Sequence, residues 1–504
     1  MTKIVLTTLN SRFSHTSIAL RYLYANLKEL QDETKILEFT INGDIENIAE
    51  EILDQNPKIV GIGVYIWNAL QVENLIEIIK SVSNEIYIVL GGPEVSHQPF
   101  RVNFSKADFI ICGEGEISFY QLCKEILKNS PPKDKIIRGQ IPSLKELQLP
   151  YKYYSDFDIK NRIVYVEASR GCPFECEFCL SSIDERVRYF DIDKLIEEFE
   201  KLWNRGVRNF KFIDRTFNLN MKIANRLIDF FLSKREKYSL HFEVIPENFN
   251  DKLKDKIKKF PPSSLQLEIG IQTLNKDVAK NINRKLNIKK IEENISFLEN
   301  ETNAHLHLDL IVGLPGENLN SFAKNLNKLV SLTKAEIQIG ILKKLSGTTI
   351  NRHDEKYKMI YSNKPPYDIL QNMFIPFKEM QKMKRFARFW DLYYNSGNFI
   401  NSITLLWKDD KDVFKNFYDF SIWIYENTKS THQISLNRLS KLLFEYLTIV
   451  KKLNPYETAN ILIKDILKIE GREIPSFLNS FKNIKFSDQK KLKKEKKRQI
   501  LRMK

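Results

Sequence analysis

The sequence predicts an α/β protein in three folded parts: a doubly wound parallel sheet, a partial (β/α)6 barrel of the TIM type, and a mainly helical C-terminal region. Short apolar runs alternate with segments of helical periodicity in two successive series along the chain. The second series ends near residue 350, and only helical periodicity follows it. At roughly 150 residues per domain, the 504 residues also have room for about three domains.

The first series predicts the doubly wound sheet over residues 1–135. Its expected strands are Lys3–Leu9, Ile59–Ile66, Ile86–Leu90 and Phe109–Cys112. Its expected helices are Thr16–Leu30, Ile48–Leu53, Leu70–Val82 and Glu116–Leu127. Because a crossover through a helix joins parallel neighbours, the alternation predicts a parallel sheet. A cluster of helix breakers at Ser130–Lys135 then leads into a linker, which we place at residues 136–160.

The second series predicts the partial barrel over residues 161–350. Its expected strands are Ile163–Ala168, Asn209–Ile213, His241–Val244, Leu265–Ile269, Leu306–Ile311 and Glu336–Leu342. Its expected helices are Ile192–Gly206, Met221–Lys234, Asp251–Lys258, Ile288–Asn300 and Leu319–Leu332. In such barrels the loops after the strands carry the chemistry. We expect a helical domain at 351–488, with helices at Tyr367–Asn395, Val413–Thr428 and Leu436–Lys452, and a basic tail at 489–504.

Composition excludes several classes of protein. Hydrophobic residues make up 42% of the chain and charged residues 28%, which is typical of a globular protein and not of a disordered one. The most apolar stretch, Ile59–Trp67, is about half the ~20 residues that a spanning helix needs. We therefore predict no membrane span and, because no targeting segment is visible, a cytoplasmic protein. Five cysteines in 504 residues do not make a disulfide scaffold.

The net charge of +15 suggests nucleic-acid binding at first sight. Residues 490–504 hold nine Lys or Arg and one Glu, a net charge of +8, which leaves 15 − 8 = +7 for the rest of the chain. Runs of like charge are usually solvated chain ends. Contact of the tail with RNA or anionic lipid is thus only weakly supported.

Three of the five cysteines, Cys172, Cys176 and Cys179, lie within eight residues, directly after the expected strand Ile163–Ala168. A structural zinc ion usually takes four protein ligands, and a redox dithiol needs only two cysteines, so neither matches this set well. Three thiolates suit a cubane iron–sulfur cluster, in which they would leave one iron without a protein ligand. An open coordination position is where a metal site binds a substrate or cofactor.

The C-x3-C-x2-C spacing after a first barrel strand resembles the radical S-adenosylmethionine (SAM) superfamily. The resemblance implies a 4Fe–4S cluster on the three cysteines and SAM on the open iron. The cluster's electron would cleave SAM into methionine and a 5′-deoxyadenosyl radical. By position in the matching segments, it implies cofactor contacts for Phe178, Asp214, Glu268, Gln272, Arg284, Gly313 and Pro315.

Three of these assignments have alternatives. The segment Phe212–Asn218, which contains Asp214, lacks the common Gly-Gly-Glu form of this family, so direct contact with SAM is open there. Glu268 is also compatible with a buried structural carboxylate, and Arg284 with an ordinary surface arginine.

The front part, a flavodoxin-like sheet before such a barrel, resembles the cobalamin-binding domain of cobalamin-dependent radical SAM enzymes. Its loops imply cobalamin contacts at Tyr65, Trp67, Gly91, Gly92 and Glu114. Many such domains carry Asp-x-His-x-x-Gly, whose histidine ligates cobalt. Here the segment Phe13–Ile18 keeps His15 without the Asp or the Gly, so we expect a hydrogen-bonding role for it. The absence of Gly-x-Gly-x-x-Gly argues against a dinucleotide, and a domain that has lost cobalamin is the alternative.

The resemblance implies methyl transfer from cobalamin to an unactivated substrate carbon, with a flavodoxin or ferredoxin type of external electron donor. A cobalamin-assisted radical rearrangement or cyclisation is the alternative within enzymes, and an RNA-modifying or RNA-binding protein using the tail is the alternative outside them. The aromatic run Phe389–Asn395, near Arg385 and Arg388, is either helix core with an Arg–Asp pair or a lid over a substrate. The sequence does not identify the substrate.

Overall fold

A computed structural model describes residues 2–481 in two compact units. The first unit runs to Glu243 and adds two later segments, Lys343–Arg352 and Tyr361–Asp368. The second unit contains Val244–Leu342, His353–Ile360 and the chain from Ile369 onward. The basic tail predicted at 489–504 lies outside the described residues.

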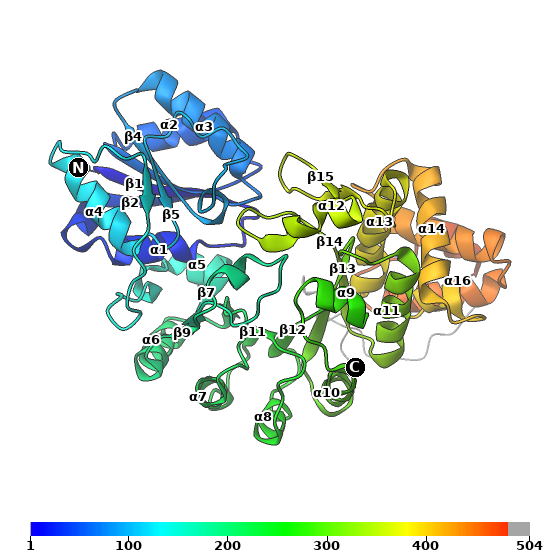
Figure 1. Cartoon of the computed structure of the whole chain (residues 1–504). Helices are drawn as coiled ribbons and strands as arrows, with labels where there is room; N and C mark the ends of the chain where they lie inside the picture. Colours follow the sequence, from blue (N-terminus) through cyan, green and yellow to red (C-terminus); the bar gives the residue numbers. More distant parts are fainter. Residues whose placement is uncertain (1, 482–504) are drawn as a thin grey trace. The chain divides into compact units, whose positions relative to one another are not determined.

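The first unit opens with a six-stranded parallel sheet in the order β2-β1-β3-β4-β5-β6 (Figure 1). The strands are β1 (Ile4–Asn10), β2 (Thr34–Thr40), β3 (Ile59–Gly63), β4 (Tyr87–Gly91), β5 (Phe109–Cys112) and β6 (Ile136–Arg138). The strand order reverses between β1 and β3, as in a flavodoxin-like sheet, and ligands bind such sheets at the carboxyl ends beside this point.

Helices cover both faces of this sheet. They are α1 (Ile18–Ala25), α2 (Ile45–Leu53), α3 (Ala69–Val82) and α4 (Glu116–Leu127). One buried core joins α2 and α3 to the sheet through residues such as Ile52 and Leu75. A second core joins α1 and α4 to the opposite face through Leu20 and Phe119. The predicted doubly wound fold is thus confirmed.

Three details of the front prediction were wrong. Strand β2 was not predicted, because only Leu37 of its seven residues is buried and an edge strand lacks a continuous apolar run. Strand β6 lies inside the predicted linker and is likewise a short, exposed edge strand. The helix predicted to span Thr16–Leu30 begins after Ser17, whose Oγ accepts from the Leu20 N–H at 3.3 Å, and ends at Ala25.

The predicted barrel strands and helices are present, three strands in each unit. The first unit contains β7 (Val164–Val166), β10 (Asn209–Phe212) and β11 (Ser239–Val244), adjacent and parallel in that order, with the unit boundary after Glu243. The second contains β12 (Leu265–Gln272), β13 (His305–Val312) and β14 (Glu336–Ile341), also parallel. The helices are α6 (Ile192–Asn204), α7 (Met221–Leu232), α8 (Asp251–Ile257), α9 (Lys276–Asn281), α10 (Ile288–Glu301) and α11 (Leu319–Leu332). Side chains of β13 alternate between buried and half-buried, as in a strand with one face on the core.

The C-terminal part of the second unit is helical. Its main helices are α13 (Phe377–Trp390), α14 (Val413–Thr428), α15 (Leu436–Glu445) and α16 (Pro455–Leu467). Two short strands, β15 (Ile360–Tyr361) and β16 (Ile369–Gln371), precede them, so the region is mainly helical, as predicted. The helix expected from Tyr367 begins at Phe377, directly after Pro376.

The aromatic run of α13 forms the core of this helical part. Trp390 and Tyr393 are fully buried, and the Trp390 indole N–H donates to the Ile337 carbonyl of β14 at 3.0 Å. Arg388 pairs with Asp391 at 3.4 Å. This is the arrangement expected if the run is core with an Arg–Asp pair. None of the described helices is long and apolar enough to cross a membrane.

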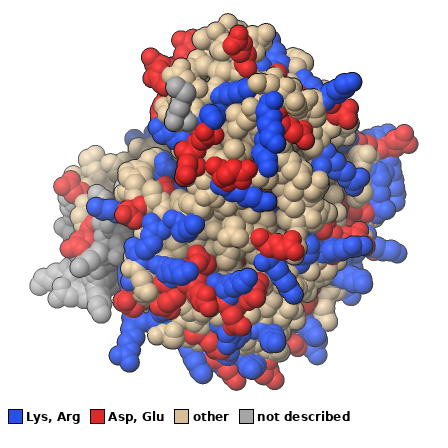
Figure 2. Space-filling view, turned by 90° about the vertical axis from the view of Figure 1, so that its left-hand side faces the viewer, with Lys and Arg blue, Asp and Glu red and all other residues tan. Residues whose placement is uncertain are grey.

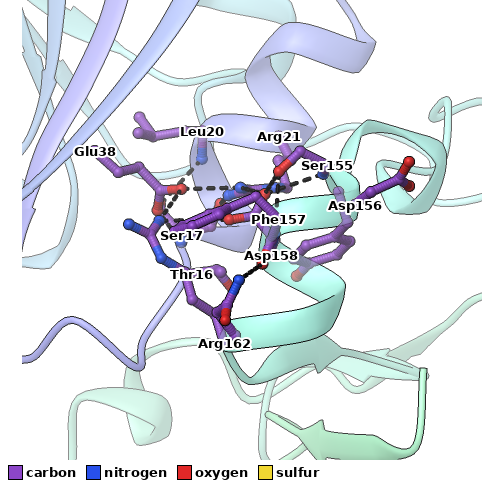
Figure 3. A network of polar contacts seen from close by, with 12 residues as sticks. Thr16, Ser17, Leu20, Arg21, Glu38, Ser155, Asp156, Phe157, Asp158 and Arg162 are labelled. Atoms are coloured by element: carbon purple, nitrogen blue, oxygen red, sulfur yellow. Dashed lines mark hydrogen bonds and ion pairs between the residues drawn. The ribbon is translucent and has the colours of Figure 1, made fainter. Parts of the chain in front are cut away.

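A buried ion network joins the front sheet to the start of the barrel segment (Figure 3). Arg21 of α1 donates to Glu38 of β2 at 2.9 Å and to Asp158 of α5 (Asp156–Asn161) at 2.8 Å. Arg162 adds longer pairs, 3.5 Å to Glu38 and 3.4 Å to Asp158. The Arg21, Glu38 and Asp158 side chains are 4%, 5% and 7% exposed. Two positive and two negative charges balance inside this joint.

Replacing Arg21→Met should destabilise the first unit by about 3–5 kcal/mol, because it strands two carboxylates in a dry environment. The measurement is urea-induced unfolding followed by circular dichroism. The matched control is Arg226→Met, since the Arg226–Asp193 pair is 53% and 73% exposed and should contribute less than about 1 kcal/mol. Equal decreases in the free energy of unfolding in the two variants would contradict a stabilising role of the buried ion network.

Candidate functional site

The cysteines lie in a loop that two short antiparallel strands close at its base. Strand β8 (Ser169–Arg170) pairs with β9 (Arg188–Tyr189), with Arg170 opposite Arg188. Between them, the Cys172 N–H donates to the Asp184 carbonyl at 2.9 Å. Gly171 has φ +89°, and a Cβ there would lie 2.4 Å from the Arg186 carbonyl oxygen. Only glycine fits this entry to the loop.

The three thiols share one small region. Cys172 and Cys176 are buried and Cys179 is half-buried. Burial raises the pKa of the Cys172 thiol, and the neighbouring Cys179 and Cys176 raise it further. No three His, Cys, Asp or Glu side chains in residues 2–481 are grouped to hold a single metal ion. Three sulfur donors fit an iron–sulfur cluster, whose binding would remove the thiol protons.

An ion pair holds the middle of the cysteine loop. Glu177, between Cys176 and Phe178, is buried, and its carboxylate accepts from the Arg352 Nε at 2.8 Å. A second Arg352 nitrogen contacts the other oxygen, so the pair is bidentate. Phe178 is half-buried beside it. Nothing in the sequence pattern signals this pair, because 175 residues separate its members.

Asp214 lies beneath the cysteine loop. Its carboxylate accepts from the Ala168 N–H at 2.9 Å and from the Ser169 Oγ at 2.5 Å, the residues that lead into the loop. Burial is the main cause that raises its pKa to about 7. Asp214 therefore positions the backbone before Cys172, and its contact with SAM stays a prediction.

The second unit positions the remaining residues predicted to bind SAM. Glu268 of β12 is the register partner of His307 of β13. Gln272 has φ +66° and sits at an irregularity in the β12–β13 pairing. Arg284 donates to the Gly270 carbonyl, which places it against the end of β12. It is therefore a packed residue rather than a free surface arginine.

The turn after β13 is tightly packed. Gly313 has φ +92°, and a Cβ on it would lie 2.8 Å from Ile369. The Pro315 carbonyl accepts from the Asn281 Nδ2 at 2.9 Å. Buried Glu317 accepts from Thr273 at 2.9 Å, and desolvation raises its pKa to about 8. The turn geometry is set by these contacts.

A cavity of about 320 Å³ opens at the carboxyl ends of the front sheet, within the first unit. Tyr65, Gly91, Gly92 and Glu114, four of the residues for which a cobalamin contact is predicted, line it. Its apolar wall comes from α1, α4 and the sheet: Leu20, Leu23, Gly61, Val89, Ile111 and Phe119. An apolar slot with a few polar groups at its edge suits a large organic cofactor.

Two residues considered for the cobalamin site, Trp67 and His15, do not line this cavity. Trp67 stacks on Tyr65 with ring centroids 4.5 Å apart, and its indole N–H donates to the Leu9 carbonyl at 3.2 Å. The His15 Nδ1 pairs with the Tyr165 hydroxyl, in keeping with the expected hydrogen-bonding role. Burial lowers the pKa of His15, and the nearby positive charges of Lys211 and Arg12 lower it further.

Three charged residues at the cavity or beside it are not among the residues predicted from the sequence. Glu167 and Arg170 line the cavity, and Arg188 pairs with Glu114. Arg170 alone carried a local signal, since it immediately precedes the Gly171-Cys172 pair.

Three family models match successive parts of the chain. They are the B12 binding domain over residues 4–122, the radical SAM superfamily over 166–329, and a protein of unknown function (DUF4080) over 355–503. The cobalamin-dependent radical SAM methyltransferase TokK of Streptomyces tokunonensis is 24% identical over 349 residues, 59% of this chain and 49% of TokK. The uncharacterized methyltransferase PH0819 of Pyrococcus horikoshii is 28% identical over 233 residues, 41% of this chain and 50% of that protein. The chain thus spans about half the length of these relatives.

Solved structures share the fold. The cobalamin-dependent SAM radical enzyme OxsB, with aqua-cobalamin and SAM bound, matches with a TM-score of 0.61 and 14% identity over 92% of this chain and 79% of OxsB. The radical SAM methyltransferase TsrM of Kitasatospora setae, with cobalamin and an iron–sulfur cluster bound, matches with a TM-score of 0.55 and 16% identity over 69% of this chain and 77% of TsrM.

The domain order, the three-cysteine loop and the cavity at the carboxyl edge of the front sheet lead to one assignment. The chain thus combines a part that matches the B12 binding domain, a part that matches the radical SAM superfamily and a C-terminal helical part that matches a domain of unknown function, and the first two matches imply cobalamin, a 4Fe–4S cluster and SAM as cofactors.

Proposed function

We propose that this enzyme transfers a methyl group to an unactivated carbon of its substrate, with SAM as the methyl source. When bound, the cluster supplies the electron that cleaves SAM, and cobalamin carries the methyl group. The observation that supports the proposal is that one unit of the fold holds both the three-cysteine loop and the cofactor-sized cavity. An external donor of the flavodoxin or ferredoxin type would supply the electron, and the cytoplasm remains the predicted location.

The chain's own residues position the cysteine loop and exclude water from the cavity. Asp214 and Gly171 fix the backbone before Cys172, and the Arg352–Glu177 pair fixes the loop between Cys176 and Cys179. Leu20, Val89 and Phe119 keep the inner wall of the cavity apolar. A dry, rigid site protects reactive intermediates from side reactions.

Methyl transfer and radical rearrangement differ in their SAM products. Reconstituted enzyme with cobalamin, SAM and a reductant should form both 5′-deoxyadenosine and S-adenosylhomocysteine, since only a methyl transfer leaves the latter. Chromatography with mass detection measures both. A rearrangement enzyme would give 5′-deoxyadenosine alone, which would contradict the proposal.

The matched control for this assay is Cys176→Ala, which should lose the cluster's absorbance and all 5′-deoxyadenosine while keeping its circular dichroism spectrum. Unchanged 5′-deoxyadenosine in this variant would contradict the assignment of the cysteine loop.

The Arg352–Glu177 pair should influence the cluster electrostatically. Arg352→Gln removes a positive charge from the cysteine loop and leaves Glu177 unbalanced, so adding an electron to the cluster becomes harder by on the order of 1 kcal/mol. We expect a more negative midpoint potential, measured by electron paramagnetic resonance during a redox titration. Glu177→Gln should shift the potential in the opposite direction.

The control for this titration is Arg226→Gln, which removes an arginine from an exposed pair. Equal potentials in Arg352→Gln, Glu177→Gln and this control would show that the pair has no electrostatic influence on the cluster.

A further inference from the structure

Two arginines face each other where the cysteine loop closes. Arg170 of β8 and Arg188 of β9 are register partners in an antiparallel pair, and their side chains are 15% and 22% exposed. Like charges directly opposite each other destabilise such a pair. The closure therefore depends on negative charge supplied from elsewhere.

Part of that charge comes from the loop that follows β5 of the front sheet. Glu114, in the loop after β5, accepts from the Arg170 Nη1 at 2.8 Å and also contacts the Arg188 Nη2. Arg170 makes two further pairs, with Glu116 at 2.8 Å and with Glu167 at 2.9 Å. Glu114 is the group that the two arginines share.

The same loop lines the cavity. Gly113, Glu114, Gly115 and Glu116 all contribute to its wall, and so does Arg170. The Arg170 guanidinium also lies over the ring of Tyr22, 4.7 Å from its centroid, and Tyr22 is another wall residue. A cofactor in the cavity thus touches the residues that neutralise the closure of the cysteine loop.

Arg188 is different, since it is not among the residues that line the cavity. Arg188 can therefore affect binding in the cavity only indirectly, through contacts such as its ion pairs with Glu114 and, at 3.2 Å, with Asp184 of the cysteine loop. A substitution of Arg188 can therefore test the coupling between the two sites without changing a residue that lines the cavity.

We propose that Glu114, Arg170 and Arg188 are positioning residues that couple the two cofactor sites, so that cobalamin in the cavity and the cluster in the cysteine loop strengthen each other's binding. Cluster assembly fixes the loop closure, which holds the two arginines on Glu114 and preorganises the cavity wall. Cobalamin fixes the same wall from the other side. This coupling presupposes the two cofactors and is independent of whether the reaction is methyl transfer.

The test compares cobalamin binding with and without the cluster. Hydroxocobalamin is titrated into the full chain, either cluster-loaded or carrying Cys172→Ala, Cys176→Ala and Cys179→Ala together, and the dissociation constants are read from absorbance. When Glu114, Arg170 and Arg188 are unchanged, we expect the cluster to tighten cobalamin binding about tenfold, within the usual 5–150-fold range of coupled sites. The ratio of interest is the dissociation constant without the cluster divided by the dissociation constant with it.

In Arg188→Gln that ratio of dissociation constants should fall to less than about twofold, because strand β9 then loses its ion pair with Glu114. Glu114→Gln should also collapse the ratio, even though it weakens binding in both forms. Arg226→Gln, the matched control from an exposed pair, should keep the full ratio. A residue that is merely structural would lower both affinities together and leave the ratio unchanged.

Two results would overturn the coupling: a ratio near one without any change at these positions, or an undiminished ratio in both Arg188→Gln and Glu114→Gln. If Arg188→Gln does not fold, as judged by circular dichroism, Glu114→Gln alone decides. A chain that takes up the cluster but no cobalamin at all would overturn the proposed function as well, so the two failures are distinguishable.

Discussion

The architecture of the first unit depends on charges that are neutralised away from water. An ionised side chain is costly to bury unless partners surround it, and removing one partner leaves the others without compensation. Arg21, Glu38, Asp158 and Arg162 meet this condition where the front sheet joins the helix before β7. Glu114, Arg170 and Arg188 meet it at the base of the cysteine loop. In each network the charges are neutralised only when the helices, strands and loops that carry them are packed as they are in this fold.

The two networks lie at opposite ends of strand β7 in sequence, at Arg162 and at Arg170. The strand between them is only three residues long. Its position is therefore set less by the ladder with β10 than by ion pairs and by hydroxyl contacts such as Tyr154 to the Tyr165 carbonyl at 2.8 Å. Because the cysteine loop follows directly, the same contacts determine where Cys172 begins.

Local patterns predicted what depends on local physics. The strands and helices of the barrel segment follow from apolar periodicity, and the cysteine spacing identified the cluster loop. Gly91, Gly92 and Glu114 were found because glycine-rich loops after parallel strands mark the ligand edge of such a sheet. Strand β2 was missed because an edge strand with a single buried residue has no distinctive periodicity.

The remainder of the site depends on pairs of residues far apart in the chain. Glu177 and Arg352, or Glu114 and Arg188, are ordinary charged residues until folding brings them together. Asp214 shows the converse. Its place after the second barrel strand suggests a cofactor contact, and the fold adds hydrogen bonds from Ala168 and Ser169 that the sequence does not reveal. Position along a strand identifies the end of the sheet, and only the fold decides which partner a side chain meets.

The first unit is not a contiguous stretch of chain, and this has a consequence for its synthesis. Glu94, buried in the loop after β4, accepts a hydrogen bond from the Tyr367 hydroxyl, while Arg101 lies over the Tyr367 ring at 4.4 Å and donates to the Lys344 carbonyl. These partners leave the ribosome more than 240 residues after the loop that they complete. In the folded unit burial raises the pKa of Glu94, while the Tyr367 hydrogen bond and Arg101 lower it, so these late partners favour the charged carboxylate. The nascent front sheet thus lacks these contacts while more than 240 further residues are synthesised, and a fragment that ends at Glu243 would lack them permanently.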